Sequence, residues 1–157
     1  MSIEFTTDLD RNIAVMKAQF AGDNTFVTRE VRSTSGLRCA VFFFDGMVNA
    51  IAINQSIIRP LMKAAQPRLS ADTLAQSVIE INDSRVEPDV NLMLASFLYG
   101  DTVILTEGDA RPVVVNTKGF ELPKTGSHGT WMFTVGGVLA MGAAAFMIYK
   151  LSKKKSY

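Results

Sequence analysis

The sequence contains few of the residues on which enzymes and metal sites depend. Its 157 residues include one cysteine, Cys39, and one histidine, His128. A single cysteine excludes a disulfide within the chain. The histidine lies beyond residues 1–121, a stretch long enough to form one globular domain. We therefore predict that this domain has no Ser–His–Asp or Cys–His centre and no histidine-ligated metal, that it takes no cofactor, and that it is not an enzyme.

The chain also lacks a strong excess of charge of either sign. Its 16 basic and 15 acidic residues give a net charge of +1, which does not indicate a nucleic-acid partner. The glycines of the domain stand singly and form no phosphate-binding loop. Cys39 directly precedes the most apolar run, Ala40–Phe44. We therefore expect a buried, unreactive thiol rather than a nucleophile.

One long run without charge is present near the C-terminus. Trp131 to Tyr149 comprises 19 residues, which as a helix would extend about 28 Å, close to the hydrocarbon core of a bilayer at about 30 Å. We predict a single transmembrane helix over residues 131–149. The basic tail that follows, residues 150–157, should stay on the cytoplasmic side because lysine is costly inside a bilayer. This membrane stop consists of Lys150, Lys153, Lys154 and Lys155.

A short motif precedes this run. Residues 122–126 read Leu-Pro-Lys-Thr-Gly, and residues 127–130 form a polar spacer before the apolar run. Together the three parts resemble the cell-wall sorting signal of Gram-positive surface proteins. The resemblance implies recognition by the transpeptidase sortase through Leu122, Pro123, Thr125 and Gly126. It also implies cleavage between Thr125 and Gly126, with transfer of the chain to peptidoglycan. The alternative is a plain C-terminal membrane anchor with an accidental pentapeptide.

The N-terminus predicts a different location from the C-terminus. Residues 1–20 carry Glu4, Asp8 and Asp10 and have no unbroken apolar core, so they do not form a secretory signal peptide. A sorting signal acts on an exported chain. We therefore expect that the true start lies upstream, that the gene is a fusion or truncation, or that export follows another route.

The domain itself predicts an α/β fold, with a mixed sheet of about four strands flanked by helices. The expected strands are residues 26–32, 37–44, 102–106 and 112–115, the last two joined as a hairpin. Two strands, a helical crossover and two further strands favour the mixed arrangement. Three acidic residues near this hairpin are expected to be solvated: Asp101, Glu107 and Asp109.

Apolar residues at helical spacing predict the helices. The first stripe is Leu9, Ile13, Met16 and Phe20, and Ser70 can cap a helix that bears Leu74, Val78 and Ile81. Pro60 should force a kink or a restart in another helix. The two remaining stripes are Val48, Ile51, Gln55, Ile58 and Met62, and then Val90, Met93, Leu94, Phe97 and Leu98.

Several local strings form a second resemblance, which covers about residues 8–121. In order they are Phe20-x-Gly-Asp-Asn-Thr-Phe26, Arg29-Glu30, Phe44-Asp45-Gly46-Met47-Val48, Ile57-Ile58-Arg59-Pro60-Leu61, Gly100-Asp101-Thr102-Val103-Ile104-Leu105 and Asn116-Thr117-Lys118-Gly119-Phe120-Glu121. They resemble the start of the A subunit of bacterial spore germination receptors, the GerA family. In that family a soluble N-terminal region precedes a multi-span membrane domain, and the assembled receptor responds to nutrients. Here Glu121 runs directly into the sorting motif, so we expect the first receptor subdomain rather than a complete receptor.

Two functions remain open at this point. In one, the chain is a non-catalytic binding or scaffolding protein related to spore germination, whose partners include germination-receptor subunits. In the other, it is a surface protein attached to peptidoglycan, and its domain serves as a recognition module. For partner contact we predict Asp45 and Asn49, because loops at the carboxyl ends of strands line clefts in open α/β sheets.

Overall fold

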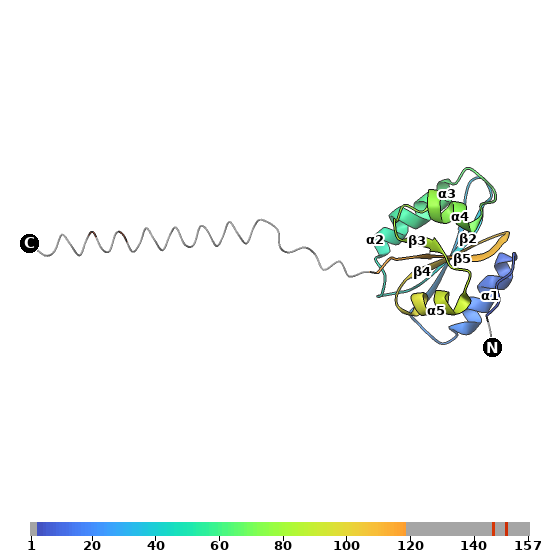
Figure 1. Ribbon diagram of the computed structural model, residues 1–157, viewed down its shortest axis with the longest axis horizontal. Coiled ribbons are helices and arrows are strands. Elements are labelled where there is room, and N and C mark those ends of the chain that lie inside the picture. The colour runs from blue at the N-terminus through green and yellow to red at the C-terminus, as the bar shows by residue number, and fades with distance from the viewer. Residues whose placement is uncertain (1–2, 119–145, 147–149, 151–157) are drawn as a thin grey trace, which may run out of the picture. The chain divides into compact units, whose positions relative to one another are not determined.

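The computed structural model describes residues 3–118, together with Phe146 and Lys150 (Figure 1). The chain divides into two units, Met1–Phe120 and Glu121–Tyr157, and the first contains the α/β domain. The sorting motif, its spacer, nearly all of the predicted membrane span and three of the four tail lysines lie outside the described residues. Within the described residues, no helix is both long and apolar enough to cross a membrane.

The domain is built on one five-stranded sheet in the order β1-β2-β4-β5-β3. All four pairs of neighbouring strands are antiparallel. The prediction of an α/β fold is therefore confirmed, but the mixed sheet of about four strands is wrong in strand number and direction. The strands are β1 (Phe26–Arg32), β2 (Arg38–Phe44), β3 (Ser84–Val86), β4 (Thr102–Thr106) and β5 (Asp109–Val115).

The sequence missed β3 because it is short and has no apolar alternation. After β2 the chain passes through helical segments to β3 at the far edge, and it crosses again before β4. β3 and β4 are both antiparallel to β5 and therefore run in the same direction. The reversal relative to β2 arises between β2 and β3, where the chain forms two helical segments in succession. A single crossover would instead have favoured a parallel pair.

Helical segments cover both faces of the sheet (Figure 1). Buried side chains of α1 (Leu9–Gln19) and α5 (Val90–Leu98) pack on one face. The other face is covered by two segments that combine α-helix and π-helix. These are α2 (Ala50–Ala52) with η1 (Ile53–Ile58) and α3 (Arg59–Lys63), and α4 (Ala71–Thr73) with η2 (Leu74–Val78).

The alternation of side chains along the strands divides the core between these two layers. In β2, Cys39 and Val41 face the π-helical layer, while Ala40, Phe42 and Phe44 face α1 and α5. This strand is buried on both faces, although Phe43 is only half-buried. The face towards α5 holds an aromatic cluster in which Phe97 contacts three other rings: Phe20, Phe26 and Phe44.

Pro60 restarts a helix, as predicted. The π-helix η1 ends at Ile58, and Pro60 lies in the first turn of α3. Proline has no N–H to donate to the carbonyl four residues earlier, and that carbonyl, on Ser56, instead accepts from the Glu80 backbone N–H at 3.0 Å. The wider π turn also changes which residues face the sheet. Ile51 and Met62 of the predicted stripe are therefore exposed, and the buried residues are Ile53, Ile57, Ile58 and Leu61.

Side chains cap the N-terminal ends of α1, α4 and α5. Asp8, Ser70 and Asp89 accept from backbone N–H groups at the starts of α1, α4 and α5, and each supplies an acceptor that a free helix end lacks. The predicted Ser70 cap is confirmed. The stripe predicted for α5 was wrong at Leu98, which is 58% exposed because α5 is apolar on most of its circumference.

Candidate functional site

A tight turn leaves the end of β2. The Asp45 side chain accepts from the Gly46 backbone N–H at 3.0 Å, and Gly46 has a φ of +84°, which glycine adopts without a steric penalty. The Asp45 backbone N–H donates to the Thr25 carbonyl at 2.7 Å. This bond joins the turn to the loop before β1. Asp45 and Gly46 therefore end β2 in a turn.

Asn49 closes the turn and starts the next helix. Its side-chain oxygen accepts from the N–H groups of Ile51 and Ala52, at 3.0 and 3.1 Å. Its own N–H donates to the Thr117 carbonyl at 2.8 Å. Asp45 and Asn49 are both exposed, but both also have these structural roles. Because the sheet is antiparallel, the rule on strand ends that suggested them does not apply, and partner contact by these residues stays a prediction.

Two further segments lie against this turn. The methyl group of Met47 packs beside Gly100, 3.4 Å from the position a Cβ would take, and Val48 forms a β-bridge with Lys118. The Lys118 ammonium lies 4.4 Å from the centre of the Tyr99 ring and 3.0 Å from an Asp101 carboxylate oxygen. The segments before β4 and after β5 therefore meet the turn at one end of the sheet.

Asp101 was predicted to be solvated, and this was wrong. Its side chain is 5% exposed, and its interaction with Lys118 compensates its charge. The reason is topological. Asp101 immediately precedes the central strand β4, where the returning chain at Lys118 covers it.

Exposed apolar side chains lie on the segments that meet here. Met47 is 42% exposed, Ile51 66% and Tyr99 74%. With the polar residues beside them they form what we call the turn surface, which comprises Asp45, Met47, Asn49, Ile51, Tyr99 and Lys118. Sequence reasoning missed Ile51 and Tyr99 as surface residues. For Tyr99 the available signal was the uncharged composition of α5, because a helix that is apolar nearly all round must expose apolar residues unless it is fully enclosed. The exposure of Ile51 depends on the π turn, which the sequence pattern did not indicate.

The turn surface also brings together strings that carried the family resemblance. Of the six strings, four contribute residues to this end of the sheet: the strings that contain Thr25, Asp45, Asp101 and Lys118. Thr25 and Asp45 share a backbone hydrogen bond, and Asp101 and Lys118 share an ion pair. Segments up to about 90 residues apart in the sequence thus meet at this end of the sheet.

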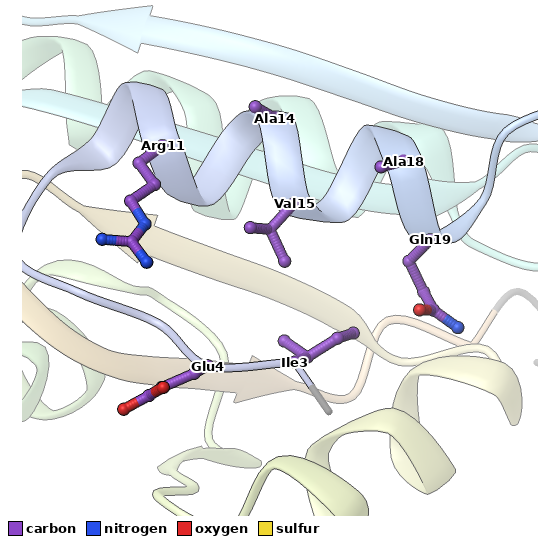
Figure 2. Close-up of a pocket in the computed structure, with 7 residues that line it drawn as sticks. All are labelled: Ile3, Glu4, Arg11, Ala14, Val15, Ala18 and Gln19. Carbon is purple, nitrogen blue, oxygen red and sulfur yellow. The ribbon is translucent and has the colours of Figure 1, made fainter. Parts of the chain in front are cut away.

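A concave surface lies along α1. It is an open groove of about 430 Å³ between the helix and the N-terminal segment, and Val15 extends from the helix towards Ile3 (Figure 2). Its lining is mostly apolar, with Glu4, Arg11 and Gln19 as its polar side chains. These three do not provide the convergent polar groups that fix a small ligand in a pocket.

The remaining reactive groups have structural surroundings. Cys39 is buried, and desolvation raises the pKa of its thiol to about 11 despite a contact with Thr106, so the reactive thiolate is disfavoured at neutral pH. No group of three or more His, Cys, Asp or Glu side chains within the described residues could hold a metal.

Asp109 links the hairpin of β4 and β5 to α4 through a hydrogen bond. It accepts from the Ala71 backbone N–H at 2.8 Å and pairs with Arg111 at 2.9 Å. Burial opposes its ionisation, but the hydrogen bonds from Arg111 and Ala71 outweigh burial and lower the pKa of this carboxyl. Its side chain is 14% exposed, so the prediction of a solvated residue was wrong here also.

The fold defines the class as an α/β domain with a five-stranded antiparallel sheet that helical segments cover on both faces. The family model described as Bacillus/Clostridium GerA spore germination protein matches residues 14–126, and the chain belongs to this family. The model for the LPXTG cell wall anchor motif matches residues 114–156. That motif implies sortase processing and attachment to peptidoglycan, and it indicates a cell-wall or membrane-anchored surface location.

The fold is also similar to a solved structure, the N-terminal domain of the A subunit of the Bacillus megaterium spore germinant receptor GerK3. The TM-score is 0.56 and the sequence identity is 21%, with 83% of this chain and 54% of that chain covered. The chain therefore spans about half the length of this relative, and the likeness concerns the fold. A search of curated proteins found no match.

Proposed function

We propose that this chain is a non-catalytic binding protein of the germination-receptor family, held at the cell surface by its sorting signal. Its domain contacts germination-receptor subunits through the turn surface. The observation that carries the proposal is the exposure of Met47, Ile51 and Tyr99 on the segments that meet at the Asp101–Lys118 ion pair. Exposed aromatic and methionine side chains next to paired charges are typical of protein interfaces.

The length of the connection to the sorting motif limits where a partner can lie. Three residues, 119–121, separate Lys118 from Leu122. Between Lys118 and the Thr125 acyl group the chain can span at most about 25 Å, because a residue extends it by about 3.3–3.6 Å. A domain attached through Thr125 would thus stay next to its wall attachment point. Its partner would therefore have to lie within reach of that point.

The second candidate function is a wall-attached surface protein whose domain is a recognition module for another ligand. The match to the LPXTG cell wall anchor motif favours it. The two candidates share the anchor and differ in the partner, so an assay must report the partner directly.

Cross-linking in sporulating cells tests the proposed contact. Chemical cross-linking followed by affinity purification of the full chain should recover a germination-receptor subunit. Ile51→Glu should reduce that recovery at least fivefold, because it places a charge on the turn surface. Met62→Glu is the matched control, since Met62 is a similarly exposed apolar residue (51%) on α3, and it should leave recovery unchanged. Equal loss in both variants, or recovery only of other wall proteins from vegetative cells, would favour the second candidate.

Wall attachment is tested separately. Mass spectrometry of wall digests should find Thr125 joined to an amine of peptidoglycan, and Thr125→Ala should leave the chain in the membrane fraction. An exported chain without this adduct would show that the segment acts as a plain membrane anchor.

A further inference from the structure

Strand β1 is an open edge of the sheet. It pairs with β2 on one side, and no strand among the described residues lies on its other side. At its two ends, the Ser33 N–H donates to the Leu37 carbonyl, and the Thr25 carbonyl accepts from Asp45. Odd-numbered residues of β1 therefore direct their backbone groups towards β2, and even-numbered residues direct theirs outward, because antiparallel ladders alternate in this way.

The outward backbone groups belong to Thr28, Glu30 and Arg32. No other described residue forms a backbone hydrogen bond with them from the open side. An edge of this kind is a template for another strand unless side chains prevent pairing. Glu30 and Arg32 are exposed, and neither forms an ion pair with another described residue within 4.0 Å.

When two copies of this edge pair in one particular register, each charged side chain lies opposite a charge of the other sign. Glu30 and Arg32 are two residues apart and therefore lie on the same face of the strand. If two copies of β1 pair antiparallel about Val31, each Glu30 lies opposite the other copy's Arg32. A shift of the centre to residue 30 would place Glu30 opposite Glu30, and a shift to residue 32 would place Arg32 opposite Arg32. Like charges directly opposite are destabilising, whereas opposite charges stabilise the pair.

We propose that two copies of this chain associate through β1, antiparallel and centred on Val31, to form a continuous ten-stranded sheet. Both copies contribute the same edge, as a twofold dimer requires. Backbone bonds from Glu30 and Arg32 supply the pairing, and the two Glu30–Arg32 ion pairs set the register. This interface uses the edge of the sheet and does not involve the turn surface.

Disulfide cross-linking of the full chain in a non-ionic detergent reads this register directly. In a Cys39→Ala background, a mixture of Glu30→Cys and Arg32→Cys chains should form a cross-linked dimer on mild oxidation. Opposite Cα atoms in a hydrogen-bonded pair are about 5.5 Å apart, which a disulfide can bridge. Glu30→Cys alone should cross-link at least tenfold less, because the two residues 30 are diagonal neighbours at about 7–8 Å. A mixture of Glu30→Cys with Arg29→Cys is the matched control and should behave like Glu30→Cys alone.

Charge-reversal variants distinguish dimerisation through β1 from association through the C-terminal segment. Glu30→Arg or Arg32→Glu should each weaken dimerisation at least tenfold in sedimentation equilibrium, and the double variant should restore it because the pairs form again with exchanged signs. A monomeric wild-type chain, equal cross-linking in all mixtures, or a double variant as weak as the singles would overturn the proposal.

Discussion

Removing the charge of Lys118 should destabilise the domain, because it leaves a carboxylate buried without its partner. We consider Lys118→Met, which keeps the unbranched stem over the Tyr99 ring and removes the ammonium. In the native chain that ammonium lies 3.0 Å from Asp101, whose side chain is 5% exposed. The perturbation therefore acts on the segment that leads from the last strand to the sorting signal.

The expected loss lies between two limits. Breaking a fully buried pair costs about 3–5 kcal/mol, and breaking an exposed pair costs about 0.2–1 kcal/mol. The carboxylate is buried, but the Lys118 side chain is 35% exposed, so water screens the pair in part. The lost cation–π contact adds about 0.5–1 kcal/mol. We expect the free energy of unfolding to fall by about 1–3 kcal/mol, a large fraction of the 5–15 kcal/mol typical of a domain.

Urea denaturation followed by circular dichroism measures this loss. Asp101→Asn in the Lys118→Met background should recover at least half of it, since the neutral amide has no charge to compensate. Lys17→Met is the control, because Lys17 is exposed at the end of α1, and it should change stability by less than about 0.5 kcal/mol. A Lys118→Met variant as stable as the wild type, or a double variant no more stable than the single, would refute the reasoning.

Three further predictions concern the rest of the domain. Phe97→Ala should lower the free energy of unfolding by about 3–5 kcal/mol, measured by urea denaturation, because the ring is fully buried among three others. Asp109→Asn should flatten the pH dependence of the free energy of unfolding in acid. The pKa of the Asp109 carboxyl is lower in the folded state than its unfolded value of 3.8, so the carboxylate stabilises the domain above pH 3.8, and this stabilisation is lost as the pH falls through the folded pKa. The Cys39 thiol should react with a thiol reagent at neutral pH at a rate set by unfolding, since burial raises its pKa to about 11; rapid labelling of the native chain would contradict this.

Much of the fold could be predicted from local signals. The bounds of β1 and β4 agree with the predicted strands, and Ser70 and Pro60 act as the sequence indicated. Each of these features depends on residues adjacent in the chain: a run of β-branched and aromatic residues, a hydroxyl at a helix start, or a missing N–H. The failures concern long-range geometry. Whether Ile51 and Met62 or Ile53 and Leu61 face the sheet depends on a π turn and on the layer beneath it.

The sequence by itself determined the chemical limits of this protein and its sorting signal. One cysteine and one histidine restrict the available catalysts, and the five residues from Leu122 to Gly126 need no fold to be recognised as a motif. Tertiary structure alone decided which residues share a surface. The antiparallel course of the sheet brings Asp45, Tyr99 and Lys118 to one end, buries Asp101 there, and leaves β1 at an open edge. Strand order and direction depend on packing between distant segments, and no local pattern encodes them.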